Sequence, residues 1–178
     1  MSLATIQIET QNDPDCAVIW LHGLGANGYD FEPIVAELNL PASVKAKFIF
    51  PHAPIQAVSL NNGMQMPAWY DIYGLEKDSK EDTAGIKKIS EEINALVQQV
   101  IDDGIAANKI VLAGFSQGGA LTLYTGLSYK QRLGGLLALS CYLPMRDQLE
   151  NFAKDTQRDL PIFMAHGTYD DVVAHAFA

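Results

Sequence analysis

Short apolar runs alternate with longer amphipathic stretches along the chain. The runs are rich in Val, Ile and Leu, are bounded by Gly, Pro or Asn, and occur at 17–22, 47–51, 109–113, 135–140 and 161–165. Continuous apolar runs of this length predict strands that are covered on both faces, as in a parallel sheet.

The clearest amphipathic stretch lies between two of these runs. One face carries Ile86, Ile89, Ile93, Val97, Val100 and Ile101, and the other carries charged and amide side chains. We expect a helix that ends near Gly104, and further helices at 29–38, at 116–127 and, from a weaker pattern, at 147–154. Alternating strands and helices predict an α/β fold, with a mostly parallel, doubly wound sheet and helices on both faces.

The stretch 51–81 fits neither pattern. It mixes prolines and glycines with large apolar side chains, so we expect an ordered excursion rather than a helix or a strand. Long ordered loops in compact domains are usually functional. The chain shows no internal repeat or linker, and 178 residues can bury a sizeable core, so we expect one domain over 1–178.

Composition and charge exclude several classes of partner. The chain is 48% hydrophobic and has 12 basic against 21 acidic residues, a net charge of −9, which disfavours nucleic acid and anionic membranes. The longest uncharged stretches, 48–70 and 110–129, are interrupted by polar residues and do not predict a membrane span. The first 15 residues do not resemble a signal peptide. Cys16 and Cys141 are expected to be buried thiols in a reducing compartment.

A Gly-x-Ser-x-Gly turn joins one predicted strand to the helix that follows it. The sequence from Ile110 runs Ile-Val-Leu-Ala-Gly-Phe-Ser-Gln-Gly-Gly-Ala. A nucleophilic serine needs such a tight turn, in which Gly114 and Gly118 leave room where a Cβ would clash. Ser116 is the candidate nucleophile, and the Gln117 amide at the helix start is a candidate oxyanion donor. The alternative is a glycine-rich turn with an incidental serine.

An earlier strand ends in a second glycine-rich loop, Leu-His-Gly-Leu-Gly-Ala-Asn-Gly at 21–28. The loop lacks the glycine spacing and the Lys-Ser/Thr pair of phosphate-binding loops, which disfavours a nucleotide site. In acyl-transfer enzymes a loop at this position supplies the second oxyanion donor, so the Leu24 amide is the candidate. His22 is expected to be structural and bonded to the loop backbone rather than a base.

The last predicted strand leads into a loop with two adjacent carboxylates. The acid of a catalytic triad orients an imidazole, and the carboxyl end of a strand near the nucleophile is a suitable place for it. Asp170 is the candidate and Asp171 the alternative, although paired aspartates in a loop are more often solvated turn residues. The four histidines and two cysteines show no ligand spacing, so no metal site is expected.

Five motifs follow one another over nearly the whole chain. They are Leu-His-Gly-Leu-Gly at 21–25, Phe-Pro-His-Ala-Pro at 50–54, Trp-Tyr-Asp-Ile at 69–72, Gly-Phe-Ser-Gln-Gly-Gly-Ala at 114–120 and His-Gly-x-x-Asp at 166–170. In this order they resemble the carboxylesterase and acyl-protein thioesterase family of α/β hydrolases. The resemblance implies the α/β-hydrolase fold and a cytoplasmic serine hydrolase that cleaves carboxylic esters or S-acyl thioesters without a cofactor.

The resemblance also implies roles for individual residues. Ser116 would be the nucleophile, Asp170 the acid, and the amides of Leu24 and Gln117 the oxyanion hole. The acyl site would be lined from the loop that holds Met64, Met66, Trp69 and Leu75. Ordinary core packing is an equal interpretation of these four side chains.

The catalytic histidine is the point at which the sequence departs from the family. α/β hydrolases carry it after the acid, beyond a further strand. Another helix-and-strand unit takes about 30 residues, whereas eight follow Asp170. We therefore expect the last strand and helix to be missing and the activity to be impaired. His166 is expected to be structural, and His175 is either a substitute base or an exposed histidine near a terminus.

Two further expectations follow from the missing strand. The run 161–165 would be an unpaired sheet edge, which favours aggregation or a homodimer through strand pairing. A second class of function also stays open, an inactive α/β-hydrolase remnant that binds acyl ligands or serves as an interaction module. A fluorophosphonate probe distinguishes the two classes because it reacts with an activated serine. Lysophospholipids and small lactones remain alternative substrates.

Overall fold

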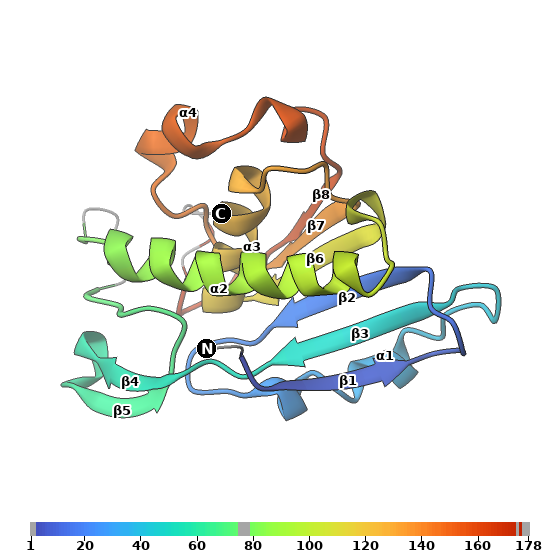
Figure 1. Ribbon diagram of the computed structural model, residues 1–178. Coiled ribbons are helices and arrows are strands. Elements are labelled where there is room, and N and C mark those ends of the chain that lie inside the picture. Colours follow the sequence, from blue (N-terminus) through green and yellow to red (C-terminus); the bar gives the residue numbers. More distant parts are fainter. Residues whose placement is uncertain (1–2, 75–78, 174, 176–178) are drawn as a thin grey trace.

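The computed structural model describes residues 3–74, 79–173 and 175. Within these residues one sheet has the strand order β1-β3-β2-β6-β7-β8, and β1 pairs antiparallel with β3 while every other pair is parallel (Figure 1). The strands are β1 Thr5–Glu9, β2 Cys16–Leu21, β3 Ala46–Pro51, β6 Ile110–Phe115, β7 Gly135–Leu139 and β8 Ile162–Ala165. The five strands predicted from the apolar runs are confirmed, but β8 is exposed rather than covered on both faces.

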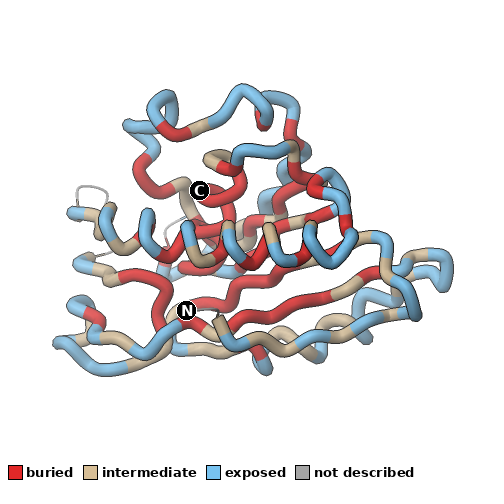
Figure 2. Tube along the Cα trace, in the orientation of Figure 1, coloured by how far each residue is buried: buried red, intermediate tan, exposed pale blue. Residues whose placement is uncertain are grey.

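Helices cover both faces of the sheet, as predicted. They are α1 Ile34–Glu37, α2 Thr83–Asp102, α3 Gln117–Ser128 and α4 Leu149–Phe152. Figure 1 shows α2 across one face and α1 behind the other. Each face has its own buried cluster: Trp20, Phe48 and Phe50 pack with residues around α1, whereas α2 and α3 pack over the opposite side of the strands. Figure 2 shows that buried positions concentrate along the central strands.

The long helix α2 forms where the amphipathic pattern predicts it. Asp82 caps its first turn by accepting the N–H of Gly85 at 2.9 Å. Gly104 follows the C-cap residue with φ +108°, so the predicted stop is confirmed. The helix predicted at 116–127 is confirmed as α3. The other two are shorter than expected, because 29–38 contains a 3₁₀ turn at Gly28–Asp30 before α1, and 147–154 contains little beyond α4.

Two parts of the fold were not predicted. The strand β1 alternates partly buried Ile6 and Ile8 with exposed polar residues, a pattern too short to stand out. The stretch 51–81, expected to lack strands, contains an antiparallel hairpin of β4 Ile55–Val58 and β5 Met64–Pro67, so that expectation is wrong there. Asn62 and Gly63 allow its turn because both have positive φ, 55° and 75°.

The carboxyl ends of β6, β7 and β8 lie at one level, because the ladder pairs Phe115 with Leu139 and Leu139 with Ala165. The strand β8 is the edge of the described sheet, and all four of its residues are exposed. Its apolar side chains Phe163 and Met164 are 62% and 46% exposed. The residues after these three strands therefore emerge along the same border of the sheet.

The structure also bears on the predictions about cysteines, metals and membranes. Both cysteines are free thiols, but only Cys141 is buried, whereas Cys16 is half-buried. No helix within the described residues is long and apolar enough to span a bilayer. The same residues contain no group of three or more His, Cys, Asp or Glu side chains placed to hold a metal ion.

Candidate active site

Ser116 lies at the turn between β6 and α3. Its backbone has φ 54° and ψ −120°, outside both the helical and the extended regions. The N–H of Ser116 donates to the carbonyl of Leu139 at 2.9 Å, and its carbonyl accepts from Ala120 at 3.0 Å. The sheet and the first turn of α3 thus hold the strained residue from both sides. Strain of this kind is concentrated at functional positions.

Two glycines make this turn possible. A Cβ on Gly114 would lie 2.3 Å from the carbonyl oxygen of Gly118, and a Cβ on Gly118 would lie 2.2 Å from that of Leu21. Cβ atoms do not approach backbone oxygens so closely, so both positions require glycine. The predicted reason for glycine in the Gly-x-Ser-x-Gly motif is confirmed.

The loop after β2 lies directly beside the serine. A Cβ on Gly23 would be 3.5 Å from the Cβ of Ser116. Neither the Leu24 N–H nor the Gln117 N–H has a hydrogen-bond partner among the described residues. Gln117 begins α3, where N–H groups lack an acceptor within the helix. The structure therefore brings the predicted nucleophile together with the segments that carry both predicted oxyanion donors.

A buried set of hydrogen bonds connects α3 to the segment 68–70 and to the loop after β2. The Gln117 carboxamide accepts the backbone N–H of Trp69 at 3.0 Å and donates to the carbonyl of Tyr70 at 2.7 Å. The indole N–H of Trp69 donates to the carbonyl of His22 at 2.7 Å. Both the Gln117 and Trp69 side chains are almost fully buried, so these bonds form away from water.

His22 is structural, as expected. Its Nε2 accepts the backbone N–H of Ala53 at 3.1 Å, and an amide N–H can only donate. The proton of the neutral ring therefore sits on Nδ1, which donates to the carbonyl of Gly23 at 2.8 Å. Burial lowers the pKa of His22, since a charged ring is poorly solvated there. The ring thus holds the start of the glycine-rich loop.

Asp170 lies in the loop after β8. One carboxylate oxygen accepts the N–H groups of Val172 and Val173, each at 2.9 Å, and these bonds lower the pKa of Asp170. The other oxygen is 3.5 Å from Nε2 of His166. That nitrogen also lies 2.7 Å from the carbonyl oxygen of Val173, so His166 helps to hold the loop that follows β8. Asp171 is exposed.

The acid and the nucleophile are brought to the same border but not into contact. Neighbouring strands lie about 4.8 Å apart, so β6 and β8 are separated by about 10 Å. None of the described histidines hydrogen-bonds to the Ser116 side chain. The exposed His175 packs edge-on against His166, with ring centroids 5.8 Å apart.

The four predicted acyl-site residues occupy different environments. Met66 lies beside the loop after β2, since its Sδ would be 3.9 Å from a Cβ on Gly25. Met64 is 63% exposed at the other end of β5, whereas Trp69 is only 1% exposed and lies within the core. Leu75 lies outside the described residues. Met66 and Trp69 thus both adjoin the candidate site, but Trp69 is buried and only Met66 keeps surface there for an acyl group.

Sequence reasoning missed two side chains at this site. Phe115, directly before the serine, is 38% exposed and would contact a Cβ on Gly23 at 3.3 Å. Its place could have been inferred from strand alternation, because it shares a face with Ala113, away from α3. The Gln117 carboxamide was also missed, since only the backbone of that residue figures in the motif.

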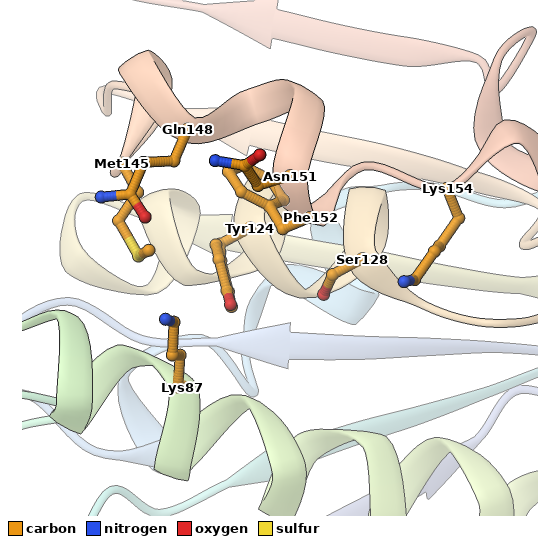
Figure 3. Close-up of a pocket in the computed structure, with 8 residues that line it drawn as sticks. All are labelled: Lys87, Tyr124, Ser128, Met145, Gln148, Asn151, Phe152 and Lys154. Atoms are coloured by element: carbon orange, nitrogen blue, oxygen red, sulfur yellow. The ribbon is translucent and has the colours of Figure 1, made fainter.

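A cavity of about 300 Å³ lies elsewhere, between α2, α3 and the segment around α4 (Figure 3). It is lined by Lys87, Tyr124, Ser128, Met145, Gln148, Asn151, Phe152 and Lys154. None of these residues belongs to the site around Ser116. The cavity is therefore separate from the place where an acyl group would react.

Comparisons with known proteins agree with this geometry. The Phospholipase/Carboxylesterase family matches residues 3–178. Acyl-protein thioesterase 1 of Cryptococcus neoformans is 38% identical over 99% of this chain and 75% of that protein. The structure of Arabidopsis thaliana SOBER1 is similar with a TM-score of 0.87 and 32% identity, over 91% of this chain and 78% of that one.

Zea mays acyl-protein thioesterase 2 is similar as well, with a TM-score of 0.85 and 29% identity over 98% of this chain and 80% of its own. The α/β-hydrolase fold expected from the motifs is thereby confirmed. The chain belongs to the phospholipase/carboxylesterase family, and it is a serine hydrolase of carboxylic esters or thioesters.

Proposed function

We propose that Ser116 is the nucleophile of this hydrolase. Its hydroxyl oxygen attacks the acyl carbon of an ester or S-acyl thioester, and its proton passes to a base and then to the alcohol or thiol that leaves. Water next attacks the acyl-serine, which releases the acid and restores the hydroxyl. The observation that carries this proposal is the strained Ser116 beside two unpaired N–H groups.

The Leu24 and Gln117 amides are the donors that we assign to the oxyanion. Negative charge develops on the carbonyl oxygen only as the tetrahedral intermediate forms, so donors fixed there stabilise the transition state more than the substrate. The N-terminal end of α3 adds to this effect, because helix dipoles favour negative charge at that end.

We assign Asp170 the role of the acid that orients an imidazole. A carboxylate is ionised at neutral pH, as this role requires, and the N–H groups of Val173 and Val172 lower the pKa of Asp170 further. Loss of one triad member in a serine protease leaves about 10³ to 10⁴-fold catalysis over water. Since no described histidine bonds to Ser116, we expect slow turnover from this chain, below the roughly 1 s⁻¹ of ordinary enzymes.

We further propose an S-acylated thiol or an ester with an apolar acyl chain as substrate. Met66 and Phe115 flank the oxyanion loop and offer apolar surface to an acyl chain. Three relatives from fungi carry the name acyl-protein thioesterase 1, which favours the thioester. The free thiols of Cys16 and Cys141 fit a cytoplasmic location.

The test is hydrolysis of 4-nitrophenyl butyrate and of a butyryl thioester by the purified chain, with intact mass confirming its length. The control is Ser116→Ala, and a fluorophosphonate probe followed by peptide mapping reports the labelled residue. We expect slow turnover that depends on the serine, and labelling at Ser116. An unlabelled Ser116 with no turnover above the alanine control would favour the inactive acyl-binding module.

We also propose that β8 mediates a homodimer. Its outer edge has no neighbour among the described residues, and Phe163 and Met164 expose apolar surface on its two sides. Light scattering after size exclusion should give twice the chain mass, and a monomer for Phe163→Lys. A clean monomer of the unmodified chain contradicts the dimer.

A further inference from the structure

We infer that Trp69 is a positioning residue for the oxyanion hole, through the hydrogen bonds by which it joins the two segments that supply the donors. The inference rests on the proposed function, because it assigns a role toward the Leu24 and Gln117 amides. It also gives Trp69 a different role from acyl binding, for which its 1% exposure leaves no surface.

The sheet alone does not fix the two donors relative to each other. Leu24 follows β2 and Gln117 follows β6, and the ladder between these strands ends at the pair Leu21 and Gly114. Both donors lie three residues beyond that pair. Close packing of Gly118 on the Leu21 and His22 carbonyls brings the two segments together, and a hydrogen-bonded contact with another part of the chain holds them there.

Trp69 supplies this contact from a third segment of the chain. Its backbone N–H donates to the Gln117 side chain at 3.0 Å, so it is attached to the residue that carries one donor. Its indole N–H donates to the His22 carbonyl at 2.7 Å, two residues before the other donor. The ring also packs against the His22 imidazole, with centroids 4.8 Å apart. Trp69 thus joins both halves of the site, through its backbone N–H on one side and its indole on the other.

The His22 imidazole connects Trp69 to the glycine-rich loop. It bonds to the Gly23 carbonyl at 2.8 Å, while the loop is held on its far side by the Gly25 N–H, which donates to Pro67 at 2.8 Å. Loss of the indole N–H would leave the buried His22 carbonyl without that donor and would free this end of the loop. The Leu24 amide would then be less well placed.

A positioning role predicts a specific kinetic signature. Donors in an oxyanion hole act on charge that exists in the transition state, so misplacing one lowers the rate of the chemical step and leaves ground-state binding unchanged. Complete removal of one donor costs about 10² to 10³-fold in other serine hydrolases. Since Trp69 acts through the loop, we expect a smaller loss, about 10-fold or more.

The test compares Trp69→Phe with Trp20→Phe. The first change keeps an aromatic ring in the core and removes the indole N–H that bonds to His22. The second is a matched control, because Trp20 is equally buried, at 3% exposure, and its indole nitrogen has no hydrogen-bond partner in the described structure. The two variants therefore differ in the bond under test rather than in the size of the change.

Inactivation by a fluorophosphonate gives the kinetic readout, since phosphonylation of Ser116 places a developing oxyanion in the same hole. We expect Trp69→Phe to lower the maximal inactivation rate about 10-fold with an unchanged half-saturating concentration, and Trp20→Phe to match the unmodified chain. Equal rates for the two variants, or an effect on half-saturation alone, would overturn the inference.

Hydrogen exchange gives a second readout that does not depend on catalysis. The Gly25 amide, bonded to Pro67, reports on the order of the oxyanion loop. We expect it to exchange about 10-fold faster in Trp69→Phe and unchanged in Trp20→Phe. If the unmodified chain does not react with the probe, the proposed function fails. Independently of that result, a Gly25 exchange rate in Trp69→Phe equal to that of the unmodified chain would reject the positioning role.

Discussion

Replacing Gly118 by alanine tests how closely α3 approaches β2. The new Cβ would lie 2.2 Å from the carbonyl oxygen of Leu21 and 2.5 Å from that of His22. Both obstacles are backbone atoms of a central strand and its end, so neither can rotate away. The N-terminal end of α3 would have to move by about 0.8 Å to reach even a 3.0 Å contact.

The expected cost follows from two opposing effects. Overpacking of a well-packed interior costs about 1–3 kcal/mol, and this obstruction belongs at the upper end. Alanine regains up to about 1 kcal/mol of helix propensity relative to glycine. The net loss is about 2 kcal/mol, which for a domain of this size lowers Tm by about 4–8 °C.

Thermal unfolding followed by circular dichroism measures this loss, with Gly126→Ala in the same helix as the control. A Cβ on Gly126 meets the side chain of Leu136, at 2.3 Å from Cδ2. Leu136 is buried, but a side chain can shift further than the backbone oxygens that obstruct Gly118, so we expect a smaller fall in Tm for Gly126→Ala than for Gly118→Ala. A Gly118→Ala protein as stable as the Gly126→Ala protein would refute the reasoning.

Three further measurements test individual groups. The pKa of His22 is lowered in the folded state, so the His22 contribution to the free energy of unfolding should be constant above about pH 6.5 and decrease below it, by at most about 1.4 kcal/mol per pH unit. Urea titrations of His22→Gln should lack this decrease. Burial raises the pKa of Cys141 to about 12, and a thiol reacts with iodoacetamide only as the thiolate. Mass spectrometry after treatment at pH 8 should therefore find Cys16 alkylated first, and Cys141 only after unfolding. Equal alkylation rates of the two cysteines would contradict this prediction. Asp170→Asn keeps an oxygen that accepts the Val172 and Val173 N–H groups, so its Tm should exceed that of Asp170→Ala. A higher Tm for Asp170→Ala would show that these hydrogen bonds do not stabilise the loop.

The fold was predictable where one pattern dominated a segment. The run 109–113 and the Gly-x-Ser-x-Gly turn gave β6 and the start of α3, because a buried strand must be apolar and a tight turn must contain glycine. The hairpin was not predictable in the same way. Ile55 and Met64 are more than 60% exposed, so no alternation of buried and exposed positions distinguishes β4 and β5 from loop.

In the candidate site, too, only the residues fixed by local sequence were predictable. Ser116 and its glycines could be located from local sequence, because a backbone constraint confined to five residues defines them. The contacts of Trp69 could not, since Gln117 is 48 positions away and His22 is 47 positions away. Burial of Trp69 was one of two equal interpretations, and only tertiary structure gives its hydrogen-bond partners.

The β4–β5 hairpin has a consequence for the evolution of substrate choice. Its strands leave and rejoin the body of the protein side by side, where the Ala68 N–H donates to Pro54 at 3.0 Å, and Pro67 accepts the Gly25 N–H of the loop after β2. Side chains between Ile55 and Met66 can change without breaking these two hydrogen bonds. Under the proposed function, acyl-chain preference can therefore diverge among descendants of one ancestor, or be recombined in the laboratory, while Ser116 and the segments beside it are inherited unchanged.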